Sequence, residues 1–280
     1  MSATSREEIA AGERFAFGEN WLRFLATIDE RRITHAEQSL CDMLDAPDLY
    51  GRTFLDAGCG SGLFSLAARR LGACVHSFDY DRQSVACALA LRRRYFSEDA
   101  SWHVEEGSVL DTDYLSRLGR FDIVYSWGVL HHTGAMWQAL DNVMRSVAEN
   151  GKLFIAIYND QGPISNRWRA VKRTYNRLPP ASRSLITIPV LVHLWWRRTA
   201  KDFFQLRPFA SWREEGRERG MSPWHDLVDW VGGYPFEVAK PEAVLDFGLQ
   251  RGFTLRRMTT CGGSLGCNEY VFVRAAKFAT

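Results

Sequence analysis

A run of small residues between Asp56 and Gly62 has the composition of a ligand-binding loop. It contains Asp-Ala-Gly-Cys-Gly-Ser-Gly and connects a predicted strand to a predicted helix. Glycine lets the backbone turn tightly and lets a ligand approach the main chain without meeting a Cβ atom. A second acid, Asp79, follows Gly60 by nineteen residues, at the end of the next predicted strand. A carboxylate there can accept two hydrogen bonds from a ribose diol.

The order of acid and glycines separates two kinds of nucleoside ligand. The dinucleotide fingerprint needs Gly or Ala five residues after its first glycine, and Leu63 stands there when the count begins at Gly58. Asp56 precedes the glycines, and a carboxylate inside the pocket suits a cationic amine and repels a pyrophosphate. No Walker lysine follows the loop. The pattern therefore favours a nucleoside that carries an amine.

Short β-rich runs alternate with helical segments on both sides of this loop. From residue 52 to residue 158 the alternation is typical of a parallel sheet with crossover helices. The predicted strands are 53–56, 74–79, 102–105, 121–126 and 153–158, and the predicted helices are 63–71, 82–94 and 136–148. The pattern resumes after Pro241 with a helix at 241–251 and strands at 253–258 and 269–274.

Residues 56–62 resemble motif I of the class I S-adenosylmethionine (SAM) dependent methyltransferases. The resemblance covers residues 50–158 and 241–274, and it includes the fourth strand at 121–126 with the turn that follows at 129–132. Asp79 corresponds to the ribose-binding acid of that family. The resemblance implies an α/β fold: a Rossmann-like, mostly parallel sheet of seven strands with helices on both faces, in which the last strand runs antiparallel.

The same resemblance implies SAM as the cofactor, S-adenosylhomocysteine as the product, and no metal. The family usually has a Gly-Asp pair after the third strand for the adenine, but this chain has Gly107-Ser108. Ser108 or Asp111 is left to make that contact. The expected cofactor-binding residues are Asp56, Gly58, Cys59, Gly60, Gly62, Asp79, Tyr80, Ser108, Val109 and Trp127.

Methyl transfer from a sulfonium is an in-line displacement, so the protein must chiefly align the acceptor and exclude water. A general base is needed only when the acceptor atom carries a proton at neutral pH. The candidates for this base are His131, His132 and His225. His131 and His132 follow the fourth predicted strand, at the edge where open α/β sheets bind ligands. The alternative is that this pair shapes the pocket wall or caps a helix.

The chain divides into three predicted parts. The resemblance implies that residues 1–50 form an N-terminal helical lid in which Phe17 or Trp21 covers the donor; the alternative is that these two rings pack in the core. Residues 51–158 and 241–280 form the SAM-binding domain. Residues 159–240 show no strand pattern and form a helical cap on the acceptor side. Between residues 165 and 219 there are thirteen Lys and Arg against four Asp and Glu, a balance of +9.

Six residues are expected to bind the acceptor. They follow the fifth strand, lie where the cap rejoins the sheet, or lie beside the last predicted strand in a Gly-rich segment. These residues are Tyr158, Asn159, Trp230, Tyr234, Asn268 and Glu269. The last two offer amide and carboxylate groups that suit a polyhydroxyl or amine acceptor.

Composition limits the kinds of partner. Apolar residues make up 46% of the chain and charged residues 24%, which is enough to build a core and excludes wholesale disorder. The net charge is only +2, so bulk charge does not make the molecule a polyanion binder. The apolar run at 185–196 has twelve residues, too few to span a bilayer. We expect a cytoplasmic protein without a transmembrane segment, and a homodimer is left open.

Three functional hypotheses follow. The first is a methyltransferase acting on an O or N atom of a small molecule such as a natural product, a phenol or quinol, or a sugar-type metabolite. The second is an RNA methyltransferase whose basic cap grips phosphates, with nucleic acid as the partner. The third is a SAM-binding protein without catalysis. The aromatic cap favours the small-molecule acceptor.

Overall fold

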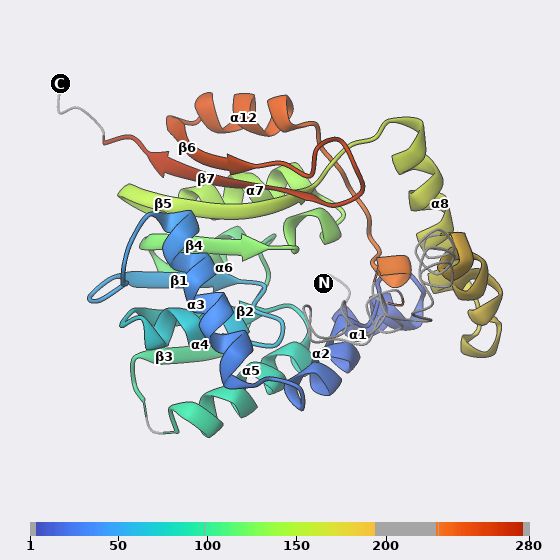
Figure 1. Ribbon diagram of the computed structural model, residues 1–280, viewed down its shortest axis with the longest axis horizontal. Coiled ribbons are helices and arrows are strands. Elements are labelled where there is room, and N and C mark those ends of the chain that lie inside the picture. The colour runs from blue at the N-terminus through green and yellow to red at the C-terminus, as the bar shows by residue number, and fades with distance from the viewer. Residues whose placement is uncertain (1–3, 98, 194–227, 229, 277–280) are drawn as a thin grey trace, which may run out of the picture.

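A seven-stranded sheet forms the centre of the computed structural model, which describes residues 4–97, 99–193, 228 and 230–276 (Figure 1). The strands are β1 (Thr53–Ala57), β2 (Cys74–Asp79), β3 (Trp102–Glu106), β4 (Phe121–Trp127), β5 (Val147–Tyr158), β6 (Phe253–Thr259) and β7 (Cys267–Arg274). Their order across the sheet is β3-β2-β1-β4-β5-β7-β6. Strands β1 to β5 are parallel, and β7 pairs antiparallel with both of its neighbours. The predicted fold class and the antiparallel last strand are confirmed.

Helices cover both faces of the sheet. The α-helices are α1 (Ser5–Ala10), α2 (Phe17–Leu25), α3 (Glu30–Leu44), α4 (Leu63–Arg70), α5 (Arg82–Tyr95), α6 (Thr112–Leu118), α7 (Met136–Arg145), α8 (Pro163–Arg177) and α12 (Pro241–Leu249). Two 3-10 turns, η1 (Leu130–His132) and η2 (Pro180–Ser182), complete the set that we describe. Helices α3, α4 and α5 pack on one face, and α6, α7 and α12 pack on the other.

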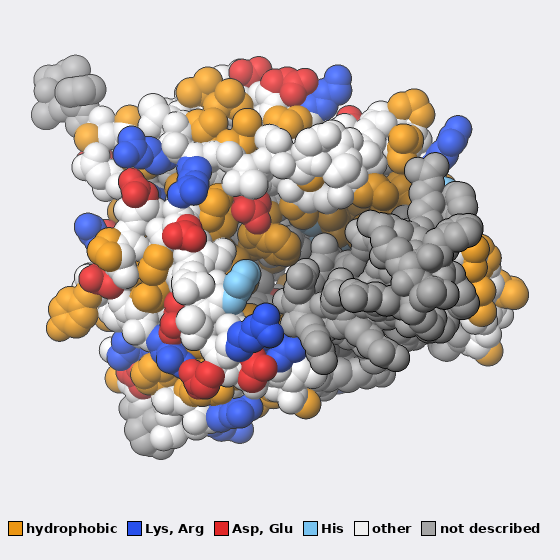
Figure 2. Space-filling view, in the orientation of Figure 1, with side chains coloured by type: hydrophobic (Ala, Val, Ile, Leu, Met, Phe, Trp, Pro, Cys, Tyr) orange, Lys and Arg blue, Asp and Glu red, His pale blue; other side chains and the backbone are white. Residues whose placement is uncertain are grey.

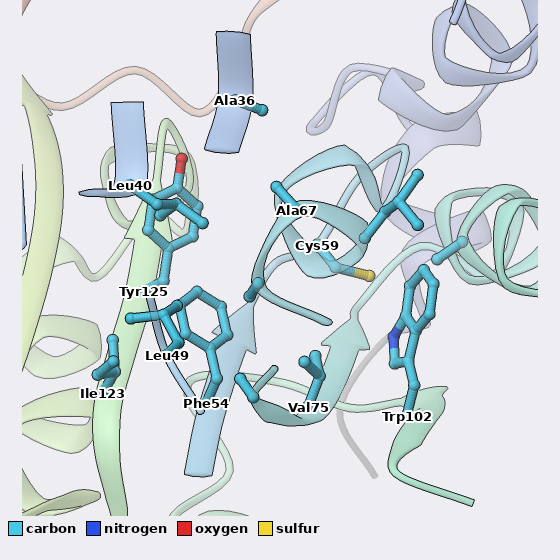
Figure 3. Packing of buried hydrophobic residues seen from close by; sticks show 14 of the residues in the cluster. Ala36, Leu40, Leu49, Phe54, Cys59, Ala67, Val75, Trp102, Ile123 and Tyr125 are labelled. Carbon is cyan, nitrogen blue, oxygen red and sulfur yellow. The ribbon is translucent and has the colours of Figure 1, made fainter. Parts of the chain in front are cut away.

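The strands are apolar on both sides because both faces are covered. On β1, Phe54 belongs to the core under α3 and α4, whereas its neighbour Leu55 belongs to the core on the opposite face. Figure 3 shows Leu40 of α3 beside the ring of Tyr125, with Trp102 of β3 at the far end of the same cluster. This packing fixes the register of the strands and therefore the positions of the residues at their carboxyl ends.

Strand β5 begins earlier than its pattern predicts. It starts at Val147, and α7 ends at Arg145, although the helix was expected to reach residue 148. The pairing with β4 jumps from Phe121↔Val147 to Ile123↔Lys152, so the extra residues form a bulge. A Gly-containing stretch that is typical of a turn thus lies inside a strand.

Helices α1, α2 and α8 lie beyond the carboxyl ends of the parallel strands (Figure 1). Hydrogen bonds hold the N-terminal segment there: Gly18 N donates to Asp81 Oδ2 at 2.9 Å, and Phe15 N donates to the carbonyl of Tyr234 at 2.9 Å. The first bond joins α2 to the start of α5. The second bond joins the residue Phe15, just before α2, to the C-terminal end of the segment 159–240, where the chain returns to the sheet. Among the described helices, none has the length and apolar character needed to cross a bilayer.

Candidate functional site at the carboxyl edge of the sheet

The glycine loop between β1 and α4 depends on positive φ angles. Gly58, Gly60 and Gly62 have φ of 87°, 53° and 81°, a region that side-chain-bearing residues rarely adopt. A Cβ atom on Gly58 would lie 2.4 Å from Cγ1 of Val129, and one on Gly62 would lie 2.9 Å from Cα of Ala88. The folded loop therefore has room only for glycine at the positions where it lies against the turn after β4 and against α5.

Asp79 joins the end of β2 to this loop. Its Oδ2 accepts from Gly60 N at 2.9 Å, and its Oδ1 accepts from Asp81 N at 2.9 Å. Burial raises the pKa of Asp79 to about 6. Each carboxylate oxygen keeps a lone pair that can accept a further hydrogen bond. The geometry thus places a partly exposed double acceptor next to the glycine loop, as a ribose diol requires.

Asp56 lies deeper than Asp79. It is 2% exposed, and its Oδ2 accepts from Ser65 Oγ at 2.5 Å. The chain continues from Trp102 Nε1 to Ser77 Oγ at 2.9 Å and from Ser77 Oγ to Ser65 Oγ at 2.8 Å. Burial raises the pKa of Asp56 to about 7, since the protein removes water from its carboxylate. Asp56 therefore anchors a polar chain that crosses three strands and α4, and its contact with a ligand amine stays a prediction.

Helix α2 covers the glycine loop. A Cβ atom on Gly60 would lie 3.0 Å from Cε2 of Trp21, so the indole lies directly against the loop backbone. Tyr80, which follows β2, donates to Glu8 Oε1 at 3.2 Å, and the guanidinium of Arg14 lies 5.0 Å from the Tyr80 ring. The predicted lid segment thus contacts both the loop and the residue after Asp79.

The other predicted cofactor residues lie around the same edge. Cys59 is buried in the loop, and burial raises the pKa of its thiol well above the ordinary value, so it stays protonated. Ser108 Oγ accepts from Leu110 N at 3.2 Å, and Val109 is buried with its carbonyl bound by Asn142. The carboxylate of Asp111 caps α6 by accepting from Tyr114 N at 2.9 Å. Both adenine candidates therefore already accept one backbone hydrogen bond, and the choice between Ser108 and Asp111 stays a prediction.

The histidine pair after β4 is buried and neutral. His131 is fully buried, its Nδ1 accepts from Tyr158 N at 3.4 Å, and burial lowers its pKa well below the ordinary value. The Nδ1 of His132 lies 2.6 Å from the carbonyl oxygen of Pro235 and must donate to it, and burial lowers the pKa of this ring to about 3. Neutral rings of such low basicity fit the alternative that the pair shapes the pocket wall. A catalytic role for either ring stays a prediction, and His225 lies outside the described residues.

Trp127 and Glu269 form a pair at the strand ends. Trp127 is 44% exposed, and its Nε1 donates to Glu269 Oε1 at 2.8 Å. The two residues lie on either side of Ala156 in the sheet, in register with it on β4 and β7. Trp127 is therefore a surface residue, and the pair offers an aromatic face and a carboxylate side by side.

Asn159 and Asn268 hold the segment between β6 and β7. Asn268 Nδ2 donates to Asn159 Oδ1 at 3.1 Å, and Asn268 Oδ1 accepts from Cys261 N at 3.1 Å. Asn159 Nδ2 also donates to the carbonyl of Ser264 at 3.3 Å. The structure thus brings both predicted residues together, with their amide groups engaged in the protein.

Tyr158 and Trp230 lie around Lys172, a residue that the sequence did not single out. Lys172 is fully buried on α8, donates to the carbonyl of Trp230, and its ammonium lies 4.6 Å from the Trp230 ring and 6.0 Å from that of Tyr158. Phe236 gives a third ring at 4.9 Å. The carbonyl of Tyr234 holds the N-terminal segment. This cationic and aromatic cluster joins α8 to the end of β5.

Comparison with known proteins agrees with this arrangement. The family model described as a methyltransferase domain matches residues 55–153, which run from β1 into β5 and include the glycine loop and Asp79. Residues 55–153 are therefore similar to methyltransferase domains. The chain has the fold of magnesium protoporphyrin IX methyltransferase from Synechocystis, a structure with bound SAM, with a TM-score of 0.55 and 12% identity over 98% of this chain and 100% of that one.

Sequence similarity to these curated proteins covers only part of the chain. Ribosomal protein L11 methyltransferase from Methylococcus capsulatus is 40% identical over 82 residues, which are 29% of this chain and 28% of that protein. The protein of the same name from Helicobacter hepaticus is 28% identical over 155 residues, 54% of this chain and 42% of that protein. The chain therefore matches less than half the length of these relatives.

Proposed function

We propose that this protein is a SAM-dependent methyltransferase that transfers a methyl group to an O or N atom of a small-molecule acceptor. The observation that carries the proposal is the loop of three positive-φ glycines whose Gly60 N–H is bound by Asp79. This arrangement leaves backbone and a double acceptor facing a ligand, where a side chain on any of the three glycines would intrude or strain the loop.

The residues of the chain would hold the cofactor from two sides. Asp79 would bind the ribose hydroxyls, and Ser108 would lie towards the adenine. Trp21, which lies against Gly60, would cover the bound nucleoside. SAM supplies a methyl group already activated on a sulfonium, so alignment and exclusion of water account for most of the work left to the protein.

The acceptor side is inferred from the groups beside β4 and β7. Trp127, which was expected to contact the cofactor, is assigned to the acceptor side in this proposal because it gives an exposed aromatic face. Glu269 beside it can accept from a hydroxyl or an amine. The described part of the cap brings further aromatic groups to this edge, including Trp168 and Trp230, whose rings are 4.2 Å apart. Such groups suit a flat or sugar-like molecule of limited size.

A protein acceptor is the second candidate, because the curated relatives of the domain are named for ribosomal protein L11. That similarity covers 29% and 54% of this chain and less than half of each relative, so we prefer the acceptor chemistry of the chain's own edge. For RNA, the face in Figure 2 gives no support, since blue and red side chains are interspersed on its described part. A phosphate-binding surface needs basic groups gathered along one track.

The experiment is to measure S-adenosylhomocysteine formation by the purified protein with three acceptor pools: a metabolite extract, ribosomal proteins and RNA. We expect turnover with the metabolite extract only, and fractionation of that extract would then isolate the acceptor. Turnover confined to ribosomal proteins or RNA would contradict the small-molecule proposal, and binding of SAM without any turnover would contradict catalysis. Asp79→Ala should lower this turnover because it weakens SAM binding. Asp246→Ala, which removes an exposed carboxylate on α12, is the matched control and should not change it.

A further inference from the structure

Three side chains with metal-binding groups meet on the edge of the sheet. His76 on β2 pairs directly with His103 on β3, and Glu105 lies two residues further along β3. Because side chains alternate along a strand, His103 and Glu105 share one face with His76. β3 is an edge strand of the sheet, the lowest strand in Figure 1, so the group is open to solvent on one side.

The distances within this group are short. His76 Nε2 lies 3.0 Å from Glu105 Oε1, and His103 Nε2 lies 3.2 Å from Glu105 Oε2. All three ligand atoms lie within 4.8 Å of one another. A tetrahedral ion with bonds of about 2.1 Å needs its ligand atoms about 3.4 Å apart, so small side-chain rotations would suffice to close the site.

We propose that His76, His103 and Glu105 bind one divalent transition-metal ion of borderline softness, of which Zn²⁺ is the representative. Two imidazole nitrogens and one carboxylate oxygen form a donor set suited to such ions, whereas Mg²⁺ and Ca²⁺ prefer oxygen alone. Water would complete the coordination, because the side chain of His103 is 58% exposed. The site takes no part in the proposed methyl transfer and does not depend on it.

Surrounding groups suit this role. Tyr114 on α6 donates to Glu105 Oε1 at 2.8 Å, so the carboxylate is already oriented by an outer partner, as metal-binding carboxylates usually are. On binding, each ring would carry its proton on Nδ1 and give up its hydrogen bond to Glu105.

The bound ion is expected to cross-link β3 and β2. An ion held by both strands stabilises the folded state, since the unfolded chain does not hold the three ligands together. His76 stands three residues before Asp79 on the same strand, so the ion would fix the strand that ends at the proposed ribose site.

The test uses untagged, chelator-treated protein titrated with Co²⁺, whose visible absorption reports tetrahedral coordination, followed by displacement with Zn²⁺. We expect one equivalent bound, at least a tenfold loss of affinity in His103→Ala, and no change in His35→Ala, which removes an exposed histidine on α3. Tyr114→Phe, which keeps the ring and removes only the hydroxyl, should weaken binding by roughly 10–100-fold.

The substitution at His103 is suited to this test because the residue is largely exposed and its loss leaves the core intact; circular dichroism would verify folding. The absence of saturable binding, or binding that survives in His103→Ala, would overturn the proposal. Loss of affinity equal in His35→Ala and His103→Ala would overturn it as well, because it would indicate scattered surface histidines.

Discussion

Gly58 stands where the chain has no room for a side chain. Its φ of 87° is unfavourable for other residues, and Val129 occupies the space where Cβ would point. The loop backbone, the turn after β4 and the ligand-facing side of the site are therefore fixed together. A single methyl group at this position tests whether this geometry matters for binding.

We predict that Gly58→Ala weakens SAM binding at least tenfold and lowers the free energy of unfolding by about 1–3 kcal/mol, the usual cost of a strained backbone conformation. Gly252→Ala is the matched control, because Gly252 has a φ of 76° but no atom within 4 Å of its Cβ position. The control should lose stability without losing affinity for SAM. Calorimetric titration and urea unfolding give both quantities, and normal affinity in Gly58→Ala would refute the loop assignment.

The glycine loop and Asp79 could be predicted from the sequence because their neighbours along the chain define the strand, the turn and the helix. The chain from Trp102 through Ser77 and Ser65 to Asp56 could not, because only the parallel pairing of β1, β2 and β3 brings these residues together. The signal that was present is a set of polar residues on otherwise buried faces.

Helix α2 connects the N-terminal segment to the site through one side chain. Trp21 lies against Gly60, while the start of the helix is bound to Asp81 at the start of α5. The helix is thus anchored at one end and presents an indole to the loop. We infer that α2 would control how fast a bound ligand leaves.

We predict that Trp21→Ala speeds SAM release by roughly tenfold, equal to about 1.4 kcal/mol of binding free energy if the association rate is unchanged. Trp137→Ala is the control, since Trp137 is a 37% exposed indole on α7 that packs on Phe247. Stopped-flow displacement measures the two rates. Identical release rates in the two variants would show that α2 does not cover the cofactor.

The starts of α7 and α12 were predictable from periodicity, aided in α12 by the proline at its first position. The predicted boundary is wrong at β5. The sequence pattern predicts the end of a helix and a turn there, whereas the structure has a Gly-containing bulge inside the strand. Lys172 shows the same limit for the cap. A basic residue on a predicted helix is expected to face solvent, yet tertiary contacts with Trp230 and Phe236 bury it.

The stability of the whole molecule should depend on pH through two buried groups, Asp56 and His132, whose contributions change in opposite directions as pH rises. The pKa of Asp56 is raised from 3.8 to about 7, so between these values the folded protein binds more protons than the unfolded chain. The Asp56 contribution to the free energy of unfolding therefore falls as pH rises through this window. His132 acts in the other direction, because its pKa is lowered from 6.5 to about 3 and the unfolded chain binds more protons between them.

The variant Asp56→Asn removes the contribution of Asp56 and keeps that of His132. The amide stays neutral at every pH, and its oxygen can still accept from Ser65. We predict that the variant gains stability relative to the wild type as pH rises from 5 to 7, by up to about 1.4 kcal/mol for each unit of pKa shift, and that the difference is constant above pH 8. Urea unfolding at each pH measures the difference. Parallel curves for the two proteins would show that Asp56 titrates normally.

Titration of SAM into the protein by isothermal calorimetry tests the central claim most directly. We predict one bound equivalent for the wild type, a loss of about 1–3 kcal/mol of binding free energy in Asp79→Ala, and no loss in Asp246→Ala. The loss is expected because the ribose hydroxyls would lose a charged double acceptor. An absence of binding in the wild type, or equal affinity in all three proteins, would contradict the assignment of this edge of the sheet as a SAM site.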